Sequence, residues 1–146
     1  MGAPVIVRSR GSFRSEVEAG RHRFVLDEPL DAGGGDEGPT PYDMLAAALG
    51  GCTAMTLVFF ARRESIPLEG VDVSVTHDRA YAKDCADCVS KEGYIHRFRV
   101  ELTFRGPLST EQKEKLLSVA SRCPVAKTLK SEILIDEVLG GVSSDQ

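Results

Sequence analysis

The chain contains no tryptophan, only three histidines and no block of basic residues among its 146 positions. Its 18 lysines and arginines are outnumbered by 22 acidic residues, which gives a formal net charge of −4 and a pI of about 5.4. A nucleic-acid-binding protein usually carries a basic patch or stripe. The charge pattern therefore predicts a protein with no nucleic-acid partner.

Long uninterrupted hydrophobic runs are also missing, although 42% of the residues are hydrophobic. A membrane-spanning helix requires about 20 consecutive apolar residues. The most apolar run, 44–61, is interrupted by two glycines and two threonines, so we interpret it as a core helix. Residues 1–8 lack the apolar segment of a signal peptide. We expect a cytoplasmic protein that does not bind membranes.

Cysteine is scarce for a protein held together by disulfides, because the chain contains only four. Cytoplasmic thiols are kept reduced, and disulfides in that compartment are usually catalytic or redox-sensing. Four cysteines in this setting indicate redox or metal chemistry rather than a structural framework.

The order of the expected elements indicates an α+β fold with mostly antiparallel sheets. We expect one domain over 1–146, with a β-meander at 4–26, a loop at 27–39 and a helical and sheet core at 40–138. Period-two alternation and turn residues predict β-strands at 5–7, 12–17, 22–26, 71–77, 94–104 and 133–138. Capping signals predict helices at 40–64 and 109–122, with a short helical restart through 129.

Cys52 lies inside the first of these helices, directly after Gly50 and Gly51. Two glycines in a helix interior cost about 1 kcal/mol each relative to alanine, which indicates close approach of another backbone or of a substrate. Apolar residues three, four and seven positions away share the face of Cys52 and predict an apolar wall around its sulfur. The alternative is a buried core cysteine without a chemical role.

Cys123 ends the second helix and precedes Pro124. Leu116, Val119 and Ala120 mark the inward face of that helix. Two helices packed in a small domain could bring Cys52 and Cys123 together as a dithiol/disulfide couple. The spacing along the chain does not by itself decide this, because a disulfide needs Cα atoms roughly 4.4–6.8 Å apart.

Cys85 and Cys88 form a C-x-x-C motif in the expected loop at 78–93. Such a motif is either half of a zinc site, which His77 and His96 could complete, or an auxiliary redox pair. The third reading is two reduced surface cysteines without a role.

Residues 38–56, which include Gly50-Gly51-Cys52-Thr53, are similar to the first cysteine motif of the OsmC/Ohr family, the osmotically induced and organic hydroperoxide resistance proteins. Segments 67–71, 105–108 and 123–129 continue the pattern of that family in the same order. The resemblance covers residues 27–138 and is that of a general OsmC-like member. It implies antiparallel sheets around two long central helices in an intertwined homodimer.

The resemblance also implies an activity, thiol-dependent reduction of organic hydroperoxides, with hydrogen peroxide as a further candidate substrate. Cys52 would be the peroxidatic thiolate and would become a sulfenic acid. Cys123 would then form a Cys52–Cys123 disulfide, which a small dithiol or a dithiol protein would reduce. No metal and no organic cofactor is implied, and the role would be antioxidant, within an oxidative stress response.

The chain departs from the hydroperoxide resistance branch of the family at one position. That branch has a glutamate ten residues before the first cysteine, paired with an arginine that contacts the thiolate, whereas this chain has Tyr42 there. The arginine would come from the N-terminal hairpin, where Arg8, Arg10 and Arg14 are candidates. The alternative function is a non-catalytic dimeric OsmC-like module that binds an apolar ligand, or zinc through the Cys85-Cys88 loop.

Overall fold

The N-terminal segment forms a three-stranded antiparallel sheet, as expected. In the computed structural model, which describes residues 2–141, strands β1 (Val5–Ser9), β2 (Ser15–Ala19) and β3 (His22–Leu26) follow one another in the sheet. Gly20 has φ +62° in the tight turn between β2 and β3, where residue Ala19 pairs with His22. This backbone conformation favours glycine.

The loop after β3 is fixed by one buried carboxylate, that of Asp27. It accepts hydrogen bonds from the backbone N–H groups of Glu28, Gly35 and Glu37. These donors, Glu28 first, hold the pKa of Asp27 below its ordinary value. The loop also contains a short 3-10 helix, η1 (Leu30–Ala32). The hydrogen bonds to Asp27 therefore fix the conformation of the segment that leads into the first long helix.

Helix α1 (Pro41–Arg63) begins at the predicted residue. Thr40 caps it, and a capping box joins Thr40 to Asp43. Its length and hydropathy would permit a membrane span, but in this fold α1 is a core helix that packs against β4, α2 and α3. It buries only one side, through Leu49, Gly50, Thr53, Leu57, Phe60 and Ala61. The all-round apolar composition of this helix would suit burial on most sides, but in the described part of the single chain nothing covers its opposite side.

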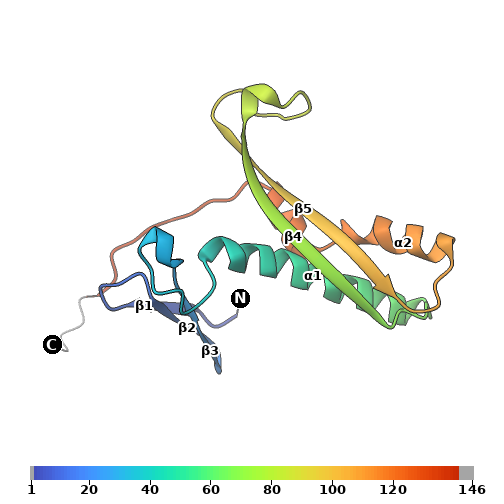
Figure 1. Cartoon of the computed structure of the whole chain (residues 1–146), viewed down its shortest axis with the longest axis horizontal. Coiled ribbons are helices and arrows are strands. Elements are labelled where there is room, and N and C mark those ends of the chain that lie inside the picture. Colours follow the sequence, from blue (N-terminus) through green and yellow to red (C-terminus); the bar gives the residue numbers. More distant parts are fainter. Residues whose placement is uncertain (1, 142–146) are drawn as a thin grey trace.

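Strands β4 (Gly70–Tyr81) and β5 (Tyr94–Arg105) form a long antiparallel hairpin. The two strands are longer than predicted and shorten the expected loop. A 3-10 turn, η2 (Ala82–Asp84), lies at the tip. In Figure 1 the hairpin crosses α1 and then extends beyond it as an arm. Only the lower part of the hairpin therefore helps to form the core.

Gly50 explains how α1 approaches β4. A Cβ atom at this position would lie 3.1 Å from Val75 Cγ2 and 3.6 Å from Val73 Cγ1. The predicted close approach is therefore confirmed for Gly50. Gly51 has nothing within 4 Å of the corresponding position in the described part of the chain. No contact among the described residues therefore explains a glycine at this position.

Helices α2 (Thr110–Ala120) and α3 (Pro124–Lys130) complete the described elements. The predicted capping box between Ser109 and Gln112 opens α2, and Pro124 occupies the first turn of α3. Helix α2 packs on the C-terminal half of α1. The resulting core consists of Leu57, Phe60, Ala61, Leu116 and Val119.

The predicted strand at 133–138 is not present. Residues 132–141 form no helix or strand, and no described strand pairs with them. A strand needs a hydrogen-bonding neighbour, and the apolar side chains of this segment are exposed, Leu134 by 84%. In Figure 1 the segment leaves α3 as an extended tail.

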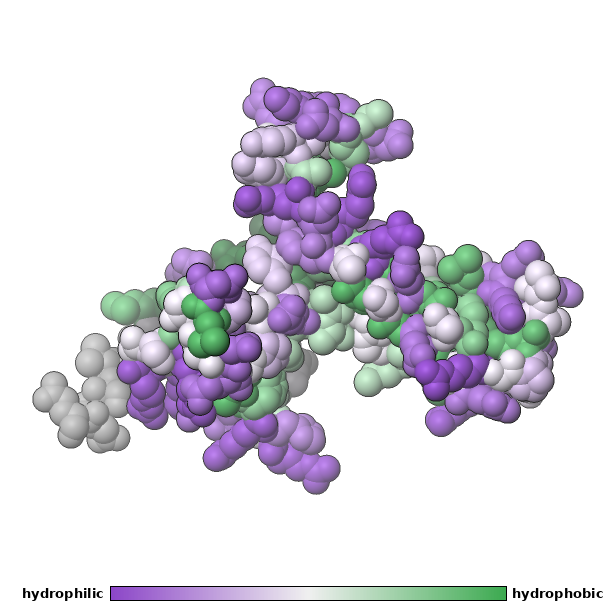
Figure 2. All heavy atoms as spheres, viewed as in Figure 1, coloured by the Kyte–Doolittle hydropathy of each residue, from purple (hydrophilic) through white to green (hydrophobic). Residues whose placement is uncertain are grey.

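Hydrophobic side chains remain open to solvent on this chain. Figure 2 shows them over the body formed by α1, β4 and β5, whereas the hairpin tip is mostly hydrophilic. Met55 and Phe59 of α1 are 74% and 67% exposed. These two residues belong to the wall predicted around Cys52, so that wall is only partly built within one chain.

Candidate functional site

Cys52 lies in the middle of α1, where the neighbouring threonines bond their hydroxyl groups to backbone carbonyls four residues earlier. Thr53 Oγ1 donates to the Leu49 carbonyl at 2.8 Å, and Thr56 Oγ1 donates to the Cys52 carbonyl at 2.8 Å. Cys52 is partly exposed, and its thiol is free. It can therefore be reached from outside the core.

Cys123 lies between α2 and α3 and is completely buried, with 0% exposure. Its Sγ lies 3.9 Å from the carbonyl oxygen of Leu49, one turn before Thr53 on α1. Leu49 lies three residues before Cys52 on α1, and each of the two free thiols influences the pKa of the other. The fold thus makes neighbours of two cysteines that are 71 positions apart in the sequence.

The surroundings of the two thiols shift their pKa values in opposite directions. Burial and the neighbouring Cys123 raise the pKa of Cys52, although the Val125 N–H group opposes this. Burial also disfavours a charged Cys123, but donation from Cys52, Ala126 N–H and the Thr53 side chain outweighs it and lowers the pKa of Cys123. The surroundings of Cys123 therefore favour its charged form, whereas those of Cys52 disfavour it.

The donors of this charge come from the start of α3. Val125 and Ala126 occupy its first turn, directly after Pro124. The protonated Cys123 side chain makes no cap hydrogen bond with the helix, so these N–H groups are free to donate to a thiolate. Such donors favour the charged form of a thiol. Within the described residues, backbone and hydroxyl groups replace the cation that the sequence led us to expect.

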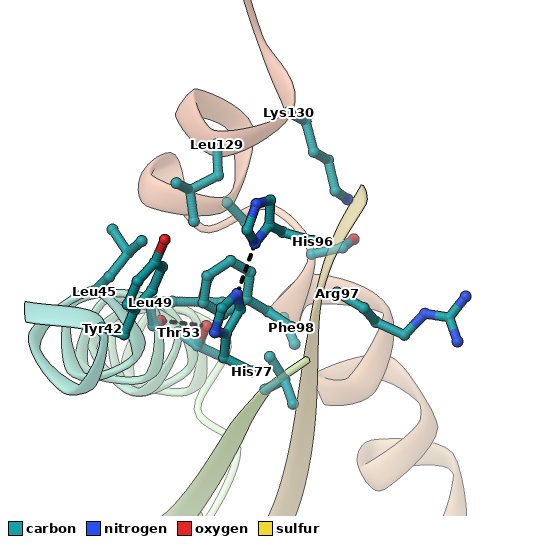
Figure 3. A pocket seen from close by; sticks show the side chains of 14 residues that line it. Tyr42, Leu45, Leu49, Thr53, His77, His96, Arg97, Phe98, Leu129 and Lys130 are labelled. Atoms are coloured by element: carbon teal, nitrogen blue, oxygen red, sulfur yellow. Dashed lines mark hydrogen bonds between the residues drawn. The ribbon is translucent and has the colours of Figure 1, made fainter. Parts of the chain in front are cut away.

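A cavity of about 680 Å³ opens beside the thiol pair. Figure 3 shows side chains of α1, the β4–β5 hairpin and α3 around it. Its walls are largely apolar, with Arg97 and Lys130 at its edge; the apolar members are Leu45, Leu49, Phe98, Val100, Ala120, Ala126 and Leu129. Neither cysteine lines the cavity, but Leu49 and Ala126 of its wall also contact Cys123.

Tyr42 lies in the cavity wall, not on the thiols. Its ring stacks on His77 with centroids 4.7 Å apart, and His77 Nε2 lies 2.9 Å from His96 Nδ1. Figure 3 shows the three rings together, with Arg97 directed away from them. The position that differs from the hydroperoxide resistance branch therefore contributes an aromatic surface to the cavity.

The three candidate arginines of the N-terminal hairpin lie at the surface. Arg8 pairs with Glu18 at 3.1 Å, and Arg14 pairs with Glu16 at 3.1 Å and Glu37 at 3.4 Å. No printed contact in the described part of the chain joins Arg8, Arg10 or Arg14 to Cys52. Within a single chain, none of the three has the predicted position beside the thiolate.

Cys85 and Cys88 are bonded to each other as a disulfide. The reading as two reduced cysteines is therefore wrong, and the disulfide leaves no thiolate in this loop for zinc. His77 and His96 bond to each other instead of completing a four-ligand set. Residues 2–141 contain no group of three or more side chains arranged to hold a metal ion. Of the readings given to this motif, the auxiliary redox pair remains.

Sequence reasoning missed Thr53 and the first turn of α3 as parts of the site. The only signal for Thr53 was its place beside Cys52. Val125 and Ala126 lower the pKa of the thiols through their backbone N–H groups. Every residue except proline has such a group, so the residue type gives no signal for it. Both contributions depend on how α3 folds back onto α1.

Comparison with known proteins places these features in a family. A family model described as OsmC-like protein matches residues 33–138. No curated protein sequence matches the chain. Among solved structures, a protein of Psychrobacter arcticus 273-4 with a proposed part in the osmotic stress and detoxification response is 25% identical, with a TM-score of 0.68 over 88% of this chain and 89% of that one.

Two further structures share the fold at lower identity. An OsmC-like protein of Mycoplasma pneumoniae is 17% identical, with a TM-score of 0.70 over 89% of this chain and 88% of the other. An organic hydroperoxide resistance protein of Legionella pneumophila is 23% identical, with a TM-score of 0.59 over 88% and 90% of the two chains. At these identities the likeness shows the fold alone.

Proposed function

Because this chain belongs to the family of OsmC-like proteins, we propose that it is a thiol-dependent peroxidase acting on organic hydroperoxides through Cys52 and Cys123. One observation carries the proposal. Of the two free thiols of the described chain, the Sγ of Cys123 lies 3.9 Å from the carbonyl of Leu49, three residues before Cys52 on α1, and Leu49 also lines an apolar cavity. The family includes hydroperoxide resistance proteins, such as the Legionella protein.

In the first step the charge of the pair moves to Cys52. Cys123 is fully buried and cannot meet a peroxide, whereas Cys52 is partly exposed. Transfer of the shared proton from Cys52 to Cys123 leaves a thiolate on the accessible sulfur. This thiolate attacks the distal oxygen of the hydroperoxide, the O–O bond breaks, and the alkoxide takes a proton and leaves as the alcohol. Cys52 becomes a sulfenic acid.

In the second step Cys123 resolves the sulfenic acid. Its sulfur attacks the sulfur of Cys52, and water leaves as the Cys52–Cys123 disulfide forms. A small dithiol or a dithiol protein then reduces the disulfide by two thiol–disulfide exchanges and is itself oxidised. The cycle requires no metal or organic cofactor. A reducing compartment, the cytoplasm, is the proposed location, and protection against oxidative stress the proposed role.

The cavity supplies a place for the organic part of the substrate. Its largely apolar wall suits a hydrocarbon tail, since burial of apolar surface stabilises binding by roughly 25 cal/mol per Å². Leu49 belongs both to this wall and to the contacts of Cys123. In the proposed mechanism the organic part of the substrate lies in this cavity and its peroxide group lies at Cys52, the partly exposed thiol.

The working molecule is proposed to be a homodimer. Each chain supplies one long helix, α1, whose uncovered side includes the exposed Met55 and Phe59. Exposed apolar patches of this kind mark association sites. A second copy would cover them and supply the second long central helix of an intertwined dimer.

The test uses protein in which Cys85 and Cys88 are both replaced by serine, so that Cys52 and Cys123 are the only thiols. Consumption of cumene hydroperoxide and hydrogen peroxide is followed with a dithiol reductant. We expect turnover in this background, its loss in Cys52→Ser, and a sulfenic acid trapped by dimedone at Cys52 in Cys123→Ser. Peptide mapping without reductant should find the Cys52–Cys123 disulfide after peroxide treatment.

The alternative, a module that binds an apolar ligand without catalysis, is favoured by the size of the cavity. It predicts saturable binding of an apolar fluorescent probe, with peroxide consumption equal in Cys52→Ser and its parent. Equal consumption in those two proteins would overturn the peroxidase proposal.

A further inference from the structure

A second pair of sulfurs lies at the far end of the hairpin arm. Cys85 and Cys88 form a disulfide at the tip, directly after η2, and Figure 1 shows this tip well away from α1. His77, which stacks on Tyr42 of α1, lies four positions before Tyr81, the last β4 residue in the ladder. At about 3.3 Å per residue, the end of the ladder lies roughly 13 Å along β4 beyond this contact with α1. This pair is thus separate from Cys52 and Cys123.

The arm does not need this disulfide to close its tip. The antiparallel ladder continues to the pair Tyr81 and Tyr94. Beyond it, Ala82 N–H donates to the Gly93 carbonyl at 2.8 Å, and Cys85 N–H donates to the Ala82 carbonyl at 3.1 Å. A disulfide that spans two intervening residues removes little chain entropy compared with one that closes a long loop. A purely structural role therefore explains the pair poorly.

The disulfide is open to another molecule. Cys85 and Cys88 are both partly exposed, and their neighbours Ala86, Asp87 and Val89 are exposed, Val89 by 98%. Figure 2 shows the tip as a mostly hydrophilic projection. Exposed disulfides are the labile, regulatory or catalytic ones, because an attacking thiolate can reach them.

The two sulfurs are electrostatically unequal. Lys91 Nζ donates to the Cys88 carbonyl at 2.9 Å, which holds an ammonium group beside Cys88. The other cation of the tip, Lys83, lies over the Tyr81 ring at 5.3 Å. Asp84 and Asp87 place negative charge in the same turn. A nearby ammonium group favours a departing thiolate, so Cys88 is the better leaving sulfur.

We propose that Cys85 and Cys88 form a second thiol–disulfide exchange site, which accepts two electrons from a dithiol reductant. A thiolate of the reductant attacks Cys85 Sγ, the Cys85–Cys88 bond breaks, and Cys88 leaves as a thiolate that takes a proton. The second thiol of the reductant, as its thiolate, then attacks the mixed disulfide and displaces Cys85, which is protonated in turn. The reductant is oxidised to its disulfide, and the tip gains two thiols.

The test uses full-length protein carrying Cys52→Ser and Cys123→Ser, so that its outcome is independent of any peroxidase activity. The folded protein is equilibrated with mixtures of reduced and oxidised dithiothreitol, quenched with an alkylating agent and weighed by mass spectrometry. We expect two alkyl groups to be gained together as the reduced fraction rises, and to be lost again when it falls. Circular dichroism should show the same fold in both states.

Two outcomes would overturn the proposal. One is a disulfide that dithiothreitol reduces only after the protein is denatured. The other is reduction that unfolds the arm and cannot be reversed, which would identify a structural bond.

A separate experiment tests whether the reductant attacks Cys85 and displaces Cys88. Lys91→Gln should slow reduction of the pair by dithiothreitol roughly two- to fivefold, the range expected for one exposed charge interaction. Lys113→Gln, on the exposed side of α2, removes the same charge far from the tip and serves as the matched control. Equal rates in the two variants would contradict departure of Cys88 beside Lys91.

Discussion

At the residue scale, the proposed chemistry depends on one proton shared by two sulfurs. Cys123 is the residue whose charged form the surroundings favour, and Cys52 is the one that a substrate can reach. Cys123 is favoured in its charged form by groups of both α3 and α1, namely Ala126 and Thr53, in the buried interior. The pair must therefore act as a unit.

Thr53 offers a way to test this arrangement. Its side chain lowers the pKa of Cys123, so Thr53→Val should raise that pKa, because the thiolate loses a donor. Since the thiolate forms as pH rises through the pKa, the variant should need a higher pH to react. Alkylation of the pair at neutral pH should become slower by roughly two- to tenfold.

The measurement is the rate of alkylation against pH in protein lacking Cys85 and Cys88. Thr103→Val is the control, since Thr103 is an exposed threonine of β5 that is not among the groups acting on either thiol. An unchanged pH profile in Thr53→Val would show that its hydroxyl remains bonded to Leu49 and does not serve the thiolate.

At the element scale, α1 is positioned by the one glycine that lets β4 approach it. Alanine at Gly50 would gain about 0.5–1 kcal/mol of helix stability, but its Cβ would lie 3.1 Å from Val75 Cγ2. The neighbour would have to shift, and the gain should be cancelled.

We therefore predict that Gly50→Ala leaves the free energy of unfolding unchanged or lower in the native background. In protein carrying Val75→Ala, the same substitution should raise it by about 0.5–1 kcal/mol. Urea unfolding at one fixed protein concentration measures both values. Equal effects of Gly50→Ala in the two backgrounds would show that Val75 does not limit the contact.

The C-terminal tail, residues 133–138, was predicted as a strand from its composition alone. Residues 133–138 are rich in β-forming side chains, yet they form no strand here. The composition of a segment indicates which conformation it favours. A β-strand also requires a neighbouring strand whose backbone groups can hydrogen-bond to it. In the single chain the segment pairs with none of the described strands.

At the scale of the whole molecule, the exposed side of α1 sets the expected assembly. Met55 and Phe59 lie one turn apart and are mostly exposed. A negative charge at either position would be buried in the proposed dimer without a partner, which is strongly unfavourable.

Met55→Asp and Phe59→Asp should therefore convert a dimer into monomers, as measured by sedimentation velocity. Val89→Asp is the matched control, because Val89 is an exposed apolar residue on the tip of the arm and not on α1. A wild-type protein that sediments as a monomer, or variants that remain dimeric, would contradict this use of α1.

The sequence by itself determined the local features of this protein. Its capping residues placed the starts of α1 and α2 correctly, since a cap is a contact between residues three positions apart. The alternation of 71–77 and 94–104 identified the two long strands. The flanks of Cys52 and Cys123 indicated the family, which the match over residues 33–138 confirmed.

Only the tertiary structure decided what those features do together. It brought Cys123 against α1 and supplied the donors from α3. In the folded chain the Tyr42 ring stacks on His77, and Cys85 and Cys88 form a disulfide. It also left much of α1 uncovered. The physical reason is that hydrogen bonding, burial and charge at a site depend on distances between atoms that are remote in the chain, and local propensities do not contain those distances.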